Sequence, residues 1–251
     1  MAPSRALTRL TLLRRAQPAA LRRYHSYDHP APAGIFNTGE QAILSAAYKH
    51  VPEHGFTQHA LSLGARDAGY LDISTNLVPD GPFSLIRYHL VTQREALAPR
   101  RELIFSGDAN ANAATTVPAR IERLTWERLL GNRDVNHRWQ EALAIMAQPS
   151  HVPASLQELA LLVDEIHFQA GDTSVDPTWY TKRGGLSIIY ASSELFMTND
   201  RSPAFGDTRA FLQRRLAEGG SLSGAVGGVT QWLSFTASAG LNVLRSKGVR
   251  I

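Results

Sequence analysis

Apolar residues recur at three- and four-residue spacing along most of the chain, which is the periodicity of one buried face of an α-helix. The first such stretch contains Ile43, Leu44, Ala47, Tyr48 and Val51. Thr38 is followed by Gln41 three residues later, a capping-box pattern that predicts the start of this helix. Pro52 and Gly55 predict its end.

Three further helical segments are expected before residue 106. A second helix covers 57–68, a very short third one begins at Asp72, and a longer helix spans 83–105. Pro99 lies inside the last of these, and a proline ring clashes with the preceding turn of a helix. We therefore expect the long helix to bend at Pro99.

The second half of the chain continues in the same way after a loop at 107–112. Helices are predicted over 118–130, 136–147, 153–168, 176–198 and 207–217, with a last segment over 221–247. Several of these begin at a proline, which is favoured in the first helical turn. Since no run alternates β-branched and polar residues, the chain predicts an all-α protein of about ten helices without internal repeats.

The first 24 residues have the composition of a mitochondrial transit peptide. They contain six arginines, three hydroxyl residues and no acidic residue, and they end in Arg22-Arg23-Tyr24. We predict cleavage after Tyr24, so that the mature protein begins near His25 in the mitochondrion. The alternative is a disordered basic tail that binds nucleic acid or a membrane.

Removal of this segment reverses the charge balance. The full chain has 26 basic and 22 acidic residues and a net charge of +4; without the six arginines, 20 basic residues face the same 22 acidic ones, which leaves about −2. A mature protein that binds a polyanion therefore gains no support from charge. The chain has no cysteine, which excludes disulfides, thiolate metal sites and a cysteine nucleophile.

Three short motifs follow one another between residues 46 and 90: His54-Gly55-Phe56-Thr57, Ala68-Gly69-Tyr70 and Ile73-Ser74-Thr75. Together they resemble the helix-turn-helix of TetR-type bacterial regulators. The resemblance implies that the Gly-aromatic-Thr step turns between the first two helices. It also implies that the Ala-Gly pair turns into the recognition helix.

Three blocks in the second half narrow the resemblance: 169–183 (QAGDTSVDPTWYTKR), 190–195 (YASSEL) and 202–208 (SPAFGDT). They are similar to the family of the ninth coenzyme Q biosynthesis protein, mitochondrial accessory proteins of ubiquinone synthesis, over about residues 38–247. The resemblance implies a TetR-like fold, a homodimer and no catalysis of its own. It further implies binding of isoprenoid lipids and association with the demethoxyubiquinone hydroxylase.

The helix-turn-helix also raises the possibility of DNA binding, which requires cationic side chains at the recognition helix and at phosphate contacts. The segment 57–82 has one basic residue, Arg66, against Asp67, Asp72 and Asp80. We therefore interpret the motif as a retained scaffold. A TetR-type DNA-binding regulator is the alternative function.

Histidines form the only cluster with potential for catalysis or metal binding. His50 and His54 are four residues apart, which could place them on one helical face with His59 nearby. Pro52 separates them, however, and no carboxylate completes a familiar ligand set. No Glu-x-x-His pair of the kind that di-iron hydroxylases use occurs in the sequence. We expect no metal site and no catalytic residue; a metal-dependent enzyme is the third possibility.

The predicted helix from Asp176 has aromatic and cationic residues near its start, namely Trp179, Tyr180, Lys182 and Arg183. Such residues dominate protein interfaces. The apolar spacing that continues beyond them equally allows Trp179 and Tyr180 to be core residues. Guided by the resemblance, we predict that Asp176, Trp179, Tyr180 and Arg183 contact the hydroxylase.

A bound isoprenoid lipid or phospholipid would need an apolar cavity among the long later helices. The candidates for its lining are Leu162, Ile166, Leu186, Ile189, Tyr190, Leu195 and Phe196. Each of them is equally suited to an ordinary core.

The segment from residue 221 onward combines an apolar stripe with positive charge near the C-terminus, as in helices that lie on membranes. The residues expected to enter the lipid are Leu222, Val226, Val229, Trp232, Leu233, Phe235 and Leu244. Four glycines would weaken this helix in water, so it needs a bilayer or the protein body for support. Packing on the core or at a dimer seam is the alternative.

These observations lead to one principal hypothesis. The protein is expected to bind an isoprenoid quinone precursor at the matrix face of the inner mitochondrial membrane and to present it to the demethoxyubiquinone hydroxylase, without a cofactor. The expected parts are a transit peptide (1–24), a flexible leader (25–37), a helix-turn-helix-like part (38–90), a lipid-binding part (91–220) and a membrane-associating helix and tail (221–251).

Overall fold

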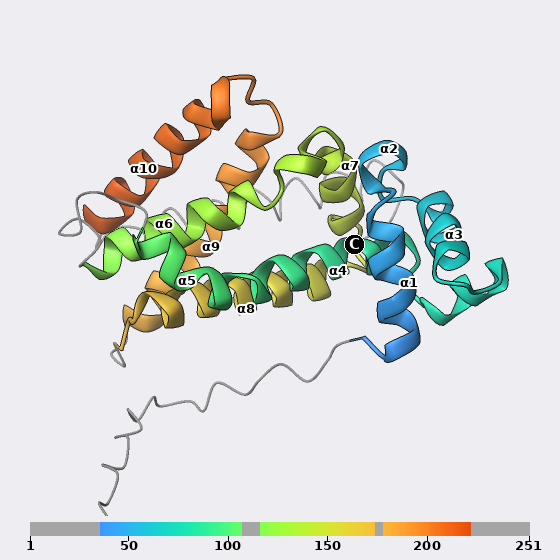
Figure 1. Cartoon of the computed structure of the whole chain (residues 1–251). Coiled ribbons are helices and arrows are strands. Elements are labelled where there is room, and N and C mark those ends of the chain that lie inside the picture. Colours follow the sequence, from blue (N-terminus) through green and yellow to red (C-terminus); the bar gives the residue numbers. More distant parts are fainter. Residues whose placement is uncertain (1–35, 107–115, 174–177, 222–251) are drawn as a thin grey trace, which may run out of the picture. The chain divides into compact units, whose positions relative to one another are not determined.

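The computed structural model describes residues 36–106, 116–173 and 178–221, all of which belong to the compact unit Pro32–Ile251. These described residues form ten α-helices with short 3-10 helices between them and contain no strand (Figure 1). The all-α prediction is therefore confirmed. The predicted transit peptide, most of the leader, Asp176 and the terminal segment from Leu222 onward lie outside the described residues.

Helix α1 (Thr38–Tyr48) begins one residue earlier than the predicted capping box. Asn37, not Thr38, is the N-cap: its Oδ1 accepts from the Glu40 N–H at 3.0 Å, and Glu40 Oε2 accepts from the Asn37 N–H at 3.0 Å. Asparagine caps at least as well as threonine, and a carboxylate in the first turn suits the helix dipole. The predicted Thr38–Gln41 pair was therefore wrong.

The predicted end of this first helix also differs from the structure. Helix α1 stops at Tyr48, and Pro52 lies in the first turn of a separate helix, α2 (Val51–His54). A proline is tolerated there because the first helical N–H groups have no intrahelical acceptor. Pro52 thus begins a helix where the sequence had suggested that it ends one.

Both turns of the helix-turn-helix resemblance are present. Helix α3 (Gln58–Asp67) has Thr57 as its N-cap and is followed by a turn at Gly69, whose φ of 79° is left-handed. The Gly69 N–H donates to the Arg66 carbonyl, and the Tyr70 N–H donates to the Ala65 carbonyl, as in a Schellman motif. The element that follows, η1 (Asp72–Leu77), is a 3-10 helix in place of an α-helical recognition helix.

Helices α1 and α3 approach each other unusually closely at Gly64. A Cβ atom at this position would lie 2.3 Å from the backbone N and Cα atoms of Ala47. No side chain can be accommodated at that distance. The crossing of the two helices therefore requires glycine at position 64.

The predicted long helix over 83–105 is two helices, α4 (Pro82–Glu95) and α5 (Leu97–Ser106). They separate at Ala96, not at Pro99. Pro99 falls in the first turn of α5, where its missing N–H breaks no hydrogen bond. The predicted bend at Pro99 was therefore wrong.

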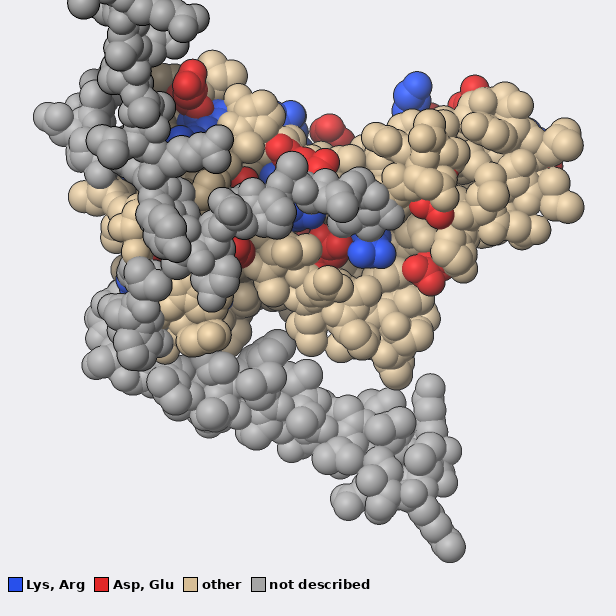
Figure 2. All heavy atoms as spheres, turned by 90° about the horizontal axis from the view of Figure 1, so that it is seen from below, with Lys and Arg blue, Asp and Glu red and all other residues tan. Residues whose placement is uncertain are grey.

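The remaining helices begin close to their predicted starts wherever those starts are described. They are α6 (Val117–Leu130), η3 (Arg133–Val135), α7 (Asn136–Met146), α8 (Val152–Ala170), α9 (Thr178–Met197), η4 (Pro203–Phe205) and α10 (Gly206–Ser221). None of the helices in the described part is both long and apolar enough to cross a membrane. On the face seen in Figure 2, charged residues gather near the middle, while the end that carries α3 and η1 is mostly uncharged.

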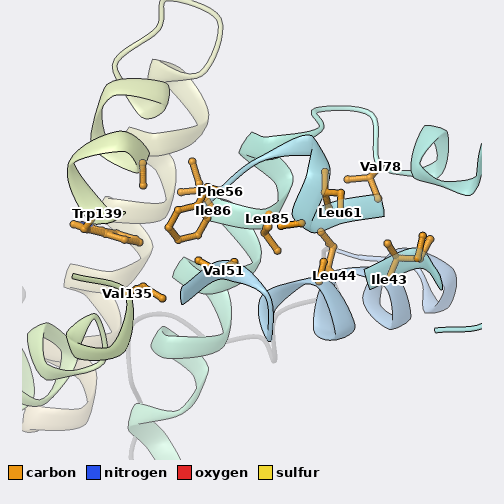
Figure 3. Packing of buried hydrophobic residues seen from close by; sticks show 14 residues of the cluster. Ile43, Leu44, Val51, Phe56, Leu61, Val78, Leu85, Ile86, Val135 and Trp139 are labelled. Atoms are coloured by element: carbon orange, nitrogen blue, oxygen red, sulfur yellow. The ribbon is translucent and has the colours of Figure 1, made fainter. Parts of the chain in front are cut away.

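Two apolar clusters hold these helices together. The first contains residues of helices α1, α2, α3, α4 and α7. Trp139 of α7 is fully buried in it and packs against Phe56 (Figure 3). The second joins α5, α6, α8, α9 and α10. A small helix-turn-helix-like part packed beside a larger bundle is the TetR-like arrangement expected from the sequence. Helix α7 nevertheless contributes to the first cluster, although it lies well beyond residue 90.

Candidate functional site

The end of α8 folds back on itself through a glycine turn. Gly171 has a left-handed φ of 79°, its N–H donates to the Phe168 carbonyl, and the Asp172 N–H donates to the His167 carbonyl. This Schellman motif returns the chain beside the last turn of α8. Asp172 is thereby placed against His167.

His167 and Asp172 form a buried pair that also approaches α9. The Nδ1–H of His167 donates to Asp172 Oδ2 at 3.0 Å, and Lys182 Nζ lies 3.9 Å from the same oxygen. Burial lowers the pKa of His167, as does the charge of Arg183, while Asp172 opposes the shift. His167 is therefore neutral near pH 7 and acts as a hydrogen-bond donor to the carboxylate.

Arg183 links α9 to α8 through Asp164 and also packs against Trp179 within α9. Its Nε donates to Asp164 Oδ1 at 2.8 Å, and its guanidinium carbon lies 3.9 Å from the centre of the Trp179 ring. A guanidinium at that distance over an indole face is a close cation–π contact. The Arg183 side chain is only 16% exposed, so it holds Trp179 in place more than it offers a surface.

Tyr180 completes this group on the solvent side. Its ring meets Trp179 edge-on, with 4.7 Å between centroids and 77° between planes. Tyr180 is 76% exposed, whereas Trp179 is half-buried. We call Asp164, Trp179, Tyr180 and Arg183 the Trp179 cluster. The ion pair between Arg183 and Asp164 holds the aromatic residues in place, and the ring of Tyr180 is open to solvent.

Three of the four predicted partner residues thus lie together, and the fourth, Asp176, lies outside the described residues. Sequence reasoning missed Asp164 and the His167–Asp172 pair. Asp164 precedes its partner Arg183 by 19 residues and sits on another helix. The acidic pair Asp164-Glu165, directly after the apolar run 159–163 of α8, was the available signal.

The predicted lipid-lining residues divide into two groups. Leu162, Ile166, Leu186, Ile189 and Tyr190 belong to the second apolar cluster or pack against it. Leu195 and Phe196 are exposed, and Phe196 stacks on Phe211 with ring centroids 4.8 Å apart. The structure thus places these seven residues, and their contact with a lipid stays a prediction.

The helix-turn-helix has little capacity for a phosphate backbone. Arg66, the single basic residue of segment 57–82, donates from Nε and Nη2 to the two carboxylate oxygens of Asp72 at 2.7 and 2.6 Å. This bidentate pair neutralises the cation. Leu71 and Ile73 are exposed at the position where a recognition helix would present polar readers.

The histidine cluster is held by other contacts. His50 Nε2 lies 2.7 Å from Asp67 Oδ2, and the rings of His54 and His59 meet edge-on at 4.8 Å. Over the described ranges, no group of three potential ligands is placed to hold a metal ion. Through His50, Asp67 instead ties the N-cap of α2 to the C-terminal end of α3.

A chain of buried polar side chains lies between the two apolar clusters. Tyr48 OH donates to His89 Nδ1 at 2.7 Å, His89 Nε2–H donates to Asn132 Oδ1 at 2.8 Å, and Asn132 Nδ2 donates to Glu194 Oε1 at 2.8 Å. The direction of these bonds follows from the single amide acceptor of Asn132. The chain connects α1, α4 and α9 through Asn132, which lies between α6 and η3.

Two further residues complete this buried polar network, which we define as Tyr48, His89, Arg128, Asn132, Tyr190 and Glu194. Arg128 Nη1 donates to Asn132 Oδ1 at 2.8 Å, and Tyr190 OH donates to Glu194 Oε1 at 3.0 Å. The Arg128 guanidinium also faces the Tyr190 ring at 5.8 Å. Five of its six side chains are buried, and Tyr48 is partly buried.

Burial governs the protonation of these groups. It lowers the pKa of His89 to about 3, with help from the charge of Arg128, so the imidazole is neutral. Burial also raises the pKa of Tyr48 to about 12, and it raises the pKa of Tyr190 well above its ordinary value. The pKa of the Glu194 carboxyl is raised by burial, against the opposing charge of Arg128.

The described residues define a TetR-like helical protein whose helix-turn-helix lacks a surplus of cations and whose α9 presents an aromatic surface. Comparisons with known proteins show similarity to one family. The model of the COQ9 family matches residues 152–222. "Ubiquinone biosynthesis protein coq9, mitochondrial" of Schizosaccharomyces pombe is 39% identical over 91% of this chain and 88% of its own length. The chain belongs to the COQ9 family.

Animal relatives are longer than this chain. The Drosophila melanogaster and human proteins, both named "Ubiquinone biosynthesis protein COQ9, mitochondrial", are 32% and 33% identical over 70% of this chain. The alignments cover 53% and 56% of those relatives, so the chain matches little more than half of their length. The family resemblance read from the three sequence blocks is confirmed.

Proposed function

We propose that this protein is a non-catalytic accessory protein of ubiquinone biosynthesis. In this proposal it binds an isoprenoid quinone precursor at the matrix face of the inner mitochondrial membrane and presents the head group to the demethoxyubiquinone hydroxylase, working as a homodimer. Family membership supports a role in ubiquinone synthesis in mitochondria, since the relatives carry both terms in their names. The transit-peptide composition of residues 1–24 supports the compartment.

The Trp179 cluster is the observation that carries the proposal. Interface hot spots are enriched in tryptophan, tyrosine and arginine, and rigid anchors lose less conformational entropy on binding than mobile ones. Trp179 is fixed between Arg183 and Tyr180, and Tyr180 projects into solvent. An aromatic pair ordered in advance suits the docking of a protein partner.

Two features of the sequence favour a binding role over catalysis. The chain lacks cysteine, and it lacks the Glu-x-x-His pairs that a di-iron hydroxylase needs on facing helices. A hydroxylase reaction is therefore assigned to the partner. The neutralised Arg66 disfavours the alternative of a DNA-binding regulator.

Capture of the purified demethoxyubiquinone hydroxylase tests the partner surface. The exposed Tyr180 is replaced in Tyr180→Ala, and Leu103→Ala serves as a control at a comparably exposed apolar residue of α5. Loss of a hot spot costs about 2 kcal/mol, so we expect the Kd to rise at least about tenfold for Tyr180→Ala alone. Equal affinity of both variants and the parent would contradict the partner surface.

Native mass spectrometry of the purified protein tests lipid binding and assembly. We expect a dimer mass with a co-purified isoprenoid or phospholipid. The proposal loses its lipid-presenting step if the protein carries no lipid after purification and takes up no isoprenoid quinone from vesicles. A monomer mass would remove the homodimer.

Deletion of residues 222–251 tests the predicted membrane segment. The variant should lose most of its binding to liposomes, while circular dichroism and thermal unfolding should report an intact helical body. Undiminished liposome binding would exclude the terminal segment as the main membrane contact.

A further inference from the structure

Four large apolar side chains are exposed within one turn of the chain after α3. Tyr70, Leu71, Ile73 and Leu77 are all exposed, with Leu71 at 76% and Ile73 at 72%. Single exposed apolar residues are ordinary on protein surfaces. Four within eight residues form a patch, which commonly marks an interaction site. We call residues Tyr70–Leu77 the η1 tip.

The local backbone explains why these side chains project. The Schellman turn at Gly69 ends α3 and leads the chain into η1, which packs against α3 and α1. The 3-10 helix that follows buries Thr75 but leaves Leu71 and Ile73 outside. The η1 tip is thus a turn whose apolar side chains project into solvent.

Several backbone carbonyls of the η1 tip are paired locally. The Ser74 N–H donates to the Leu71 carbonyl at 2.8 Å, and the Val78 N–H donates to the Thr75 carbonyl at 3.0 Å. The Thr75 hydroxyl also donates to the Asp72 carbonyl at 2.9 Å. A segment that leaves water for lipid must pair its own polar groups in this way.

The charges of the η1 tip point to the kind of surface that it meets. Its single charged residue, Asp72, is held by Arg66 in a bidentate pair, so the turn carries almost no net charge. In Figure 2 the end of the described chain that carries α3 and η1 is likewise mostly uncharged. An uncharged apolar turn complements a zwitterionic lipid surface better than a charged protein surface.

The side-chain types agree with this match. Leucine is under-represented among protein–protein hot spots, whereas aliphatic side chains beside a tyrosine suit the boundary between head groups and acyl chains. We propose that Leu71 and Ile73 insert into the surface of a lipid bilayer. This contact is separate from the Trp179 cluster and from the terminal segment, so it goes beyond the proposed function.

The absence of cysteine from the chain allows a direct test. Leu71→Cys is labelled with the environment-sensitive dye NBD in the full-length protein and mixed with phosphatidylcholine vesicles. We expect a blue shift and an intensity increase of about twofold or more, with quenching by spin-labelled lipids. Leu103→Cys, labelled in the same way, is the control, because Leu103 is 73% exposed on α5; its emission should stay unchanged.

A second variant measures the contribution to binding. Leu71→Ser with Ile73→Ser should weaken partitioning to the same vesicles at least about tenfold, since burial of each CH₂ group contributes about 0.8 kcal/mol. The loss should be the same at low and high salt, because the η1 tip is not cationic. Unchanged partitioning of this double variant would overturn the proposal.

Other outcomes would also refute it. These are a label at position 71 that stays in water while the protein floats with vesicles, and a blue shift that depends on protein concentration without lipid, which would indicate self-association. Failure of the η1 tip leaves hydroxylase capture by Tyr180 and lipid co-purification unaffected. The two proposals are therefore tested separately.

Discussion

The buried polar network and the Trp179 cluster are built from the same kinds of side chain but differ in exposure. In the network, Arg128 faces Tyr190 and bonds Asn132, and all of these side chains are buried. In the cluster, Arg183 faces Trp179 and bonds Asp164, while Tyr180 remains open to solvent. Both groups therefore contain an arginine whose guanidinium faces an aromatic ring.

The comparison teaches that residue type alone does not separate a structural role from a recognition role. Enclosed polar groups are costly unless each finds a partner, so the network specifies how the two apolar clusters meet. The Trp179 cluster keeps one ring outside, so part of its apolar surface is available for a partner. Variants in each group should therefore affect different quantities.

Removal of the central amide should have the largest effect on stability. Asn132→Ala takes away three hydrogen bonds and leaves Arg128 and Glu194 buried without their bridge. We expect a loss of about 3–5 kcal/mol in the free energy of unfolding, measured by urea denaturation. Gln140→Ala, at an exposed hydrogen-bonding residue, should stay within about 0.5 kcal/mol. A loss below about 1 kcal/mol for Asn132→Ala would show that the network is dispensable.

Acid should destabilise the protein through His89. Its pKa is about 3 in the folded protein against 6.5 for an ordinary histidine, so below pH 6.5 the unfolded chain takes up a proton that the folded protein does not. This contribution is fully present above pH 6.5 and should fall by about 2 kcal/mol between pH 6.5 and 5, at about 1.4 kcal/mol per pH unit.

The variant His89→Gln isolates this effect, because an amide can donate to Asn132 and accept from Tyr48 without titrating. Glu194, whose raised pKa has the opposite effect, and His167 are common to both proteins and cancel in the difference. Urea denaturation at several pH values should show a steeper loss for the parent. Parallel curves would contradict a neutral, buried His89.

Arg183→Met should have an intermediate effect on stability. The variant loses the ion pair with Asp164 and the contact over Trp179, which together contribute about 1–2 kcal/mol. Release of the Trp179 ring should also lower affinity for the hydroxylase. Arg201→Met, at an exposed arginine, is the control. An unchanged melting temperature and tryptophan emission would indicate that Arg183 does not hold Trp179.

Tyr180→Ala should have the smallest effect on stability, below about 0.5 kcal/mol, because the side chain is exposed. Its expected loss of hydroxylase binding would then be a pure surface effect. A destabilisation above about 1 kcal/mol would instead assign Tyr180 to the core, the role that apolar spacing alone had left open.

Much of the helical pattern could be predicted because its signals act over a few residues. Thr57 was predicted to begin a helix and is its N-cap, and Gly69 ends that helix as expected. The start of α1 and the break at Ala96 were missed, since neighbouring residues offered competing caps and Pro99 is harmless in a first turn.

The sequence by itself determined the all-α class, the positions of most helices, the family and the shortage of cations in the helix-turn-helix. These rest on local spacing and composition. Tertiary structure alone decided that Asp164 supports Arg183 and that Asn132 joins His89 to Glu194, across 43 and 62 positions. It also decided that Leu71 and Ile73 face solvent. The 3.6-residue periodicity of a helix indicates which of its faces is buried, but it does not indicate which distant helix will pack against that face.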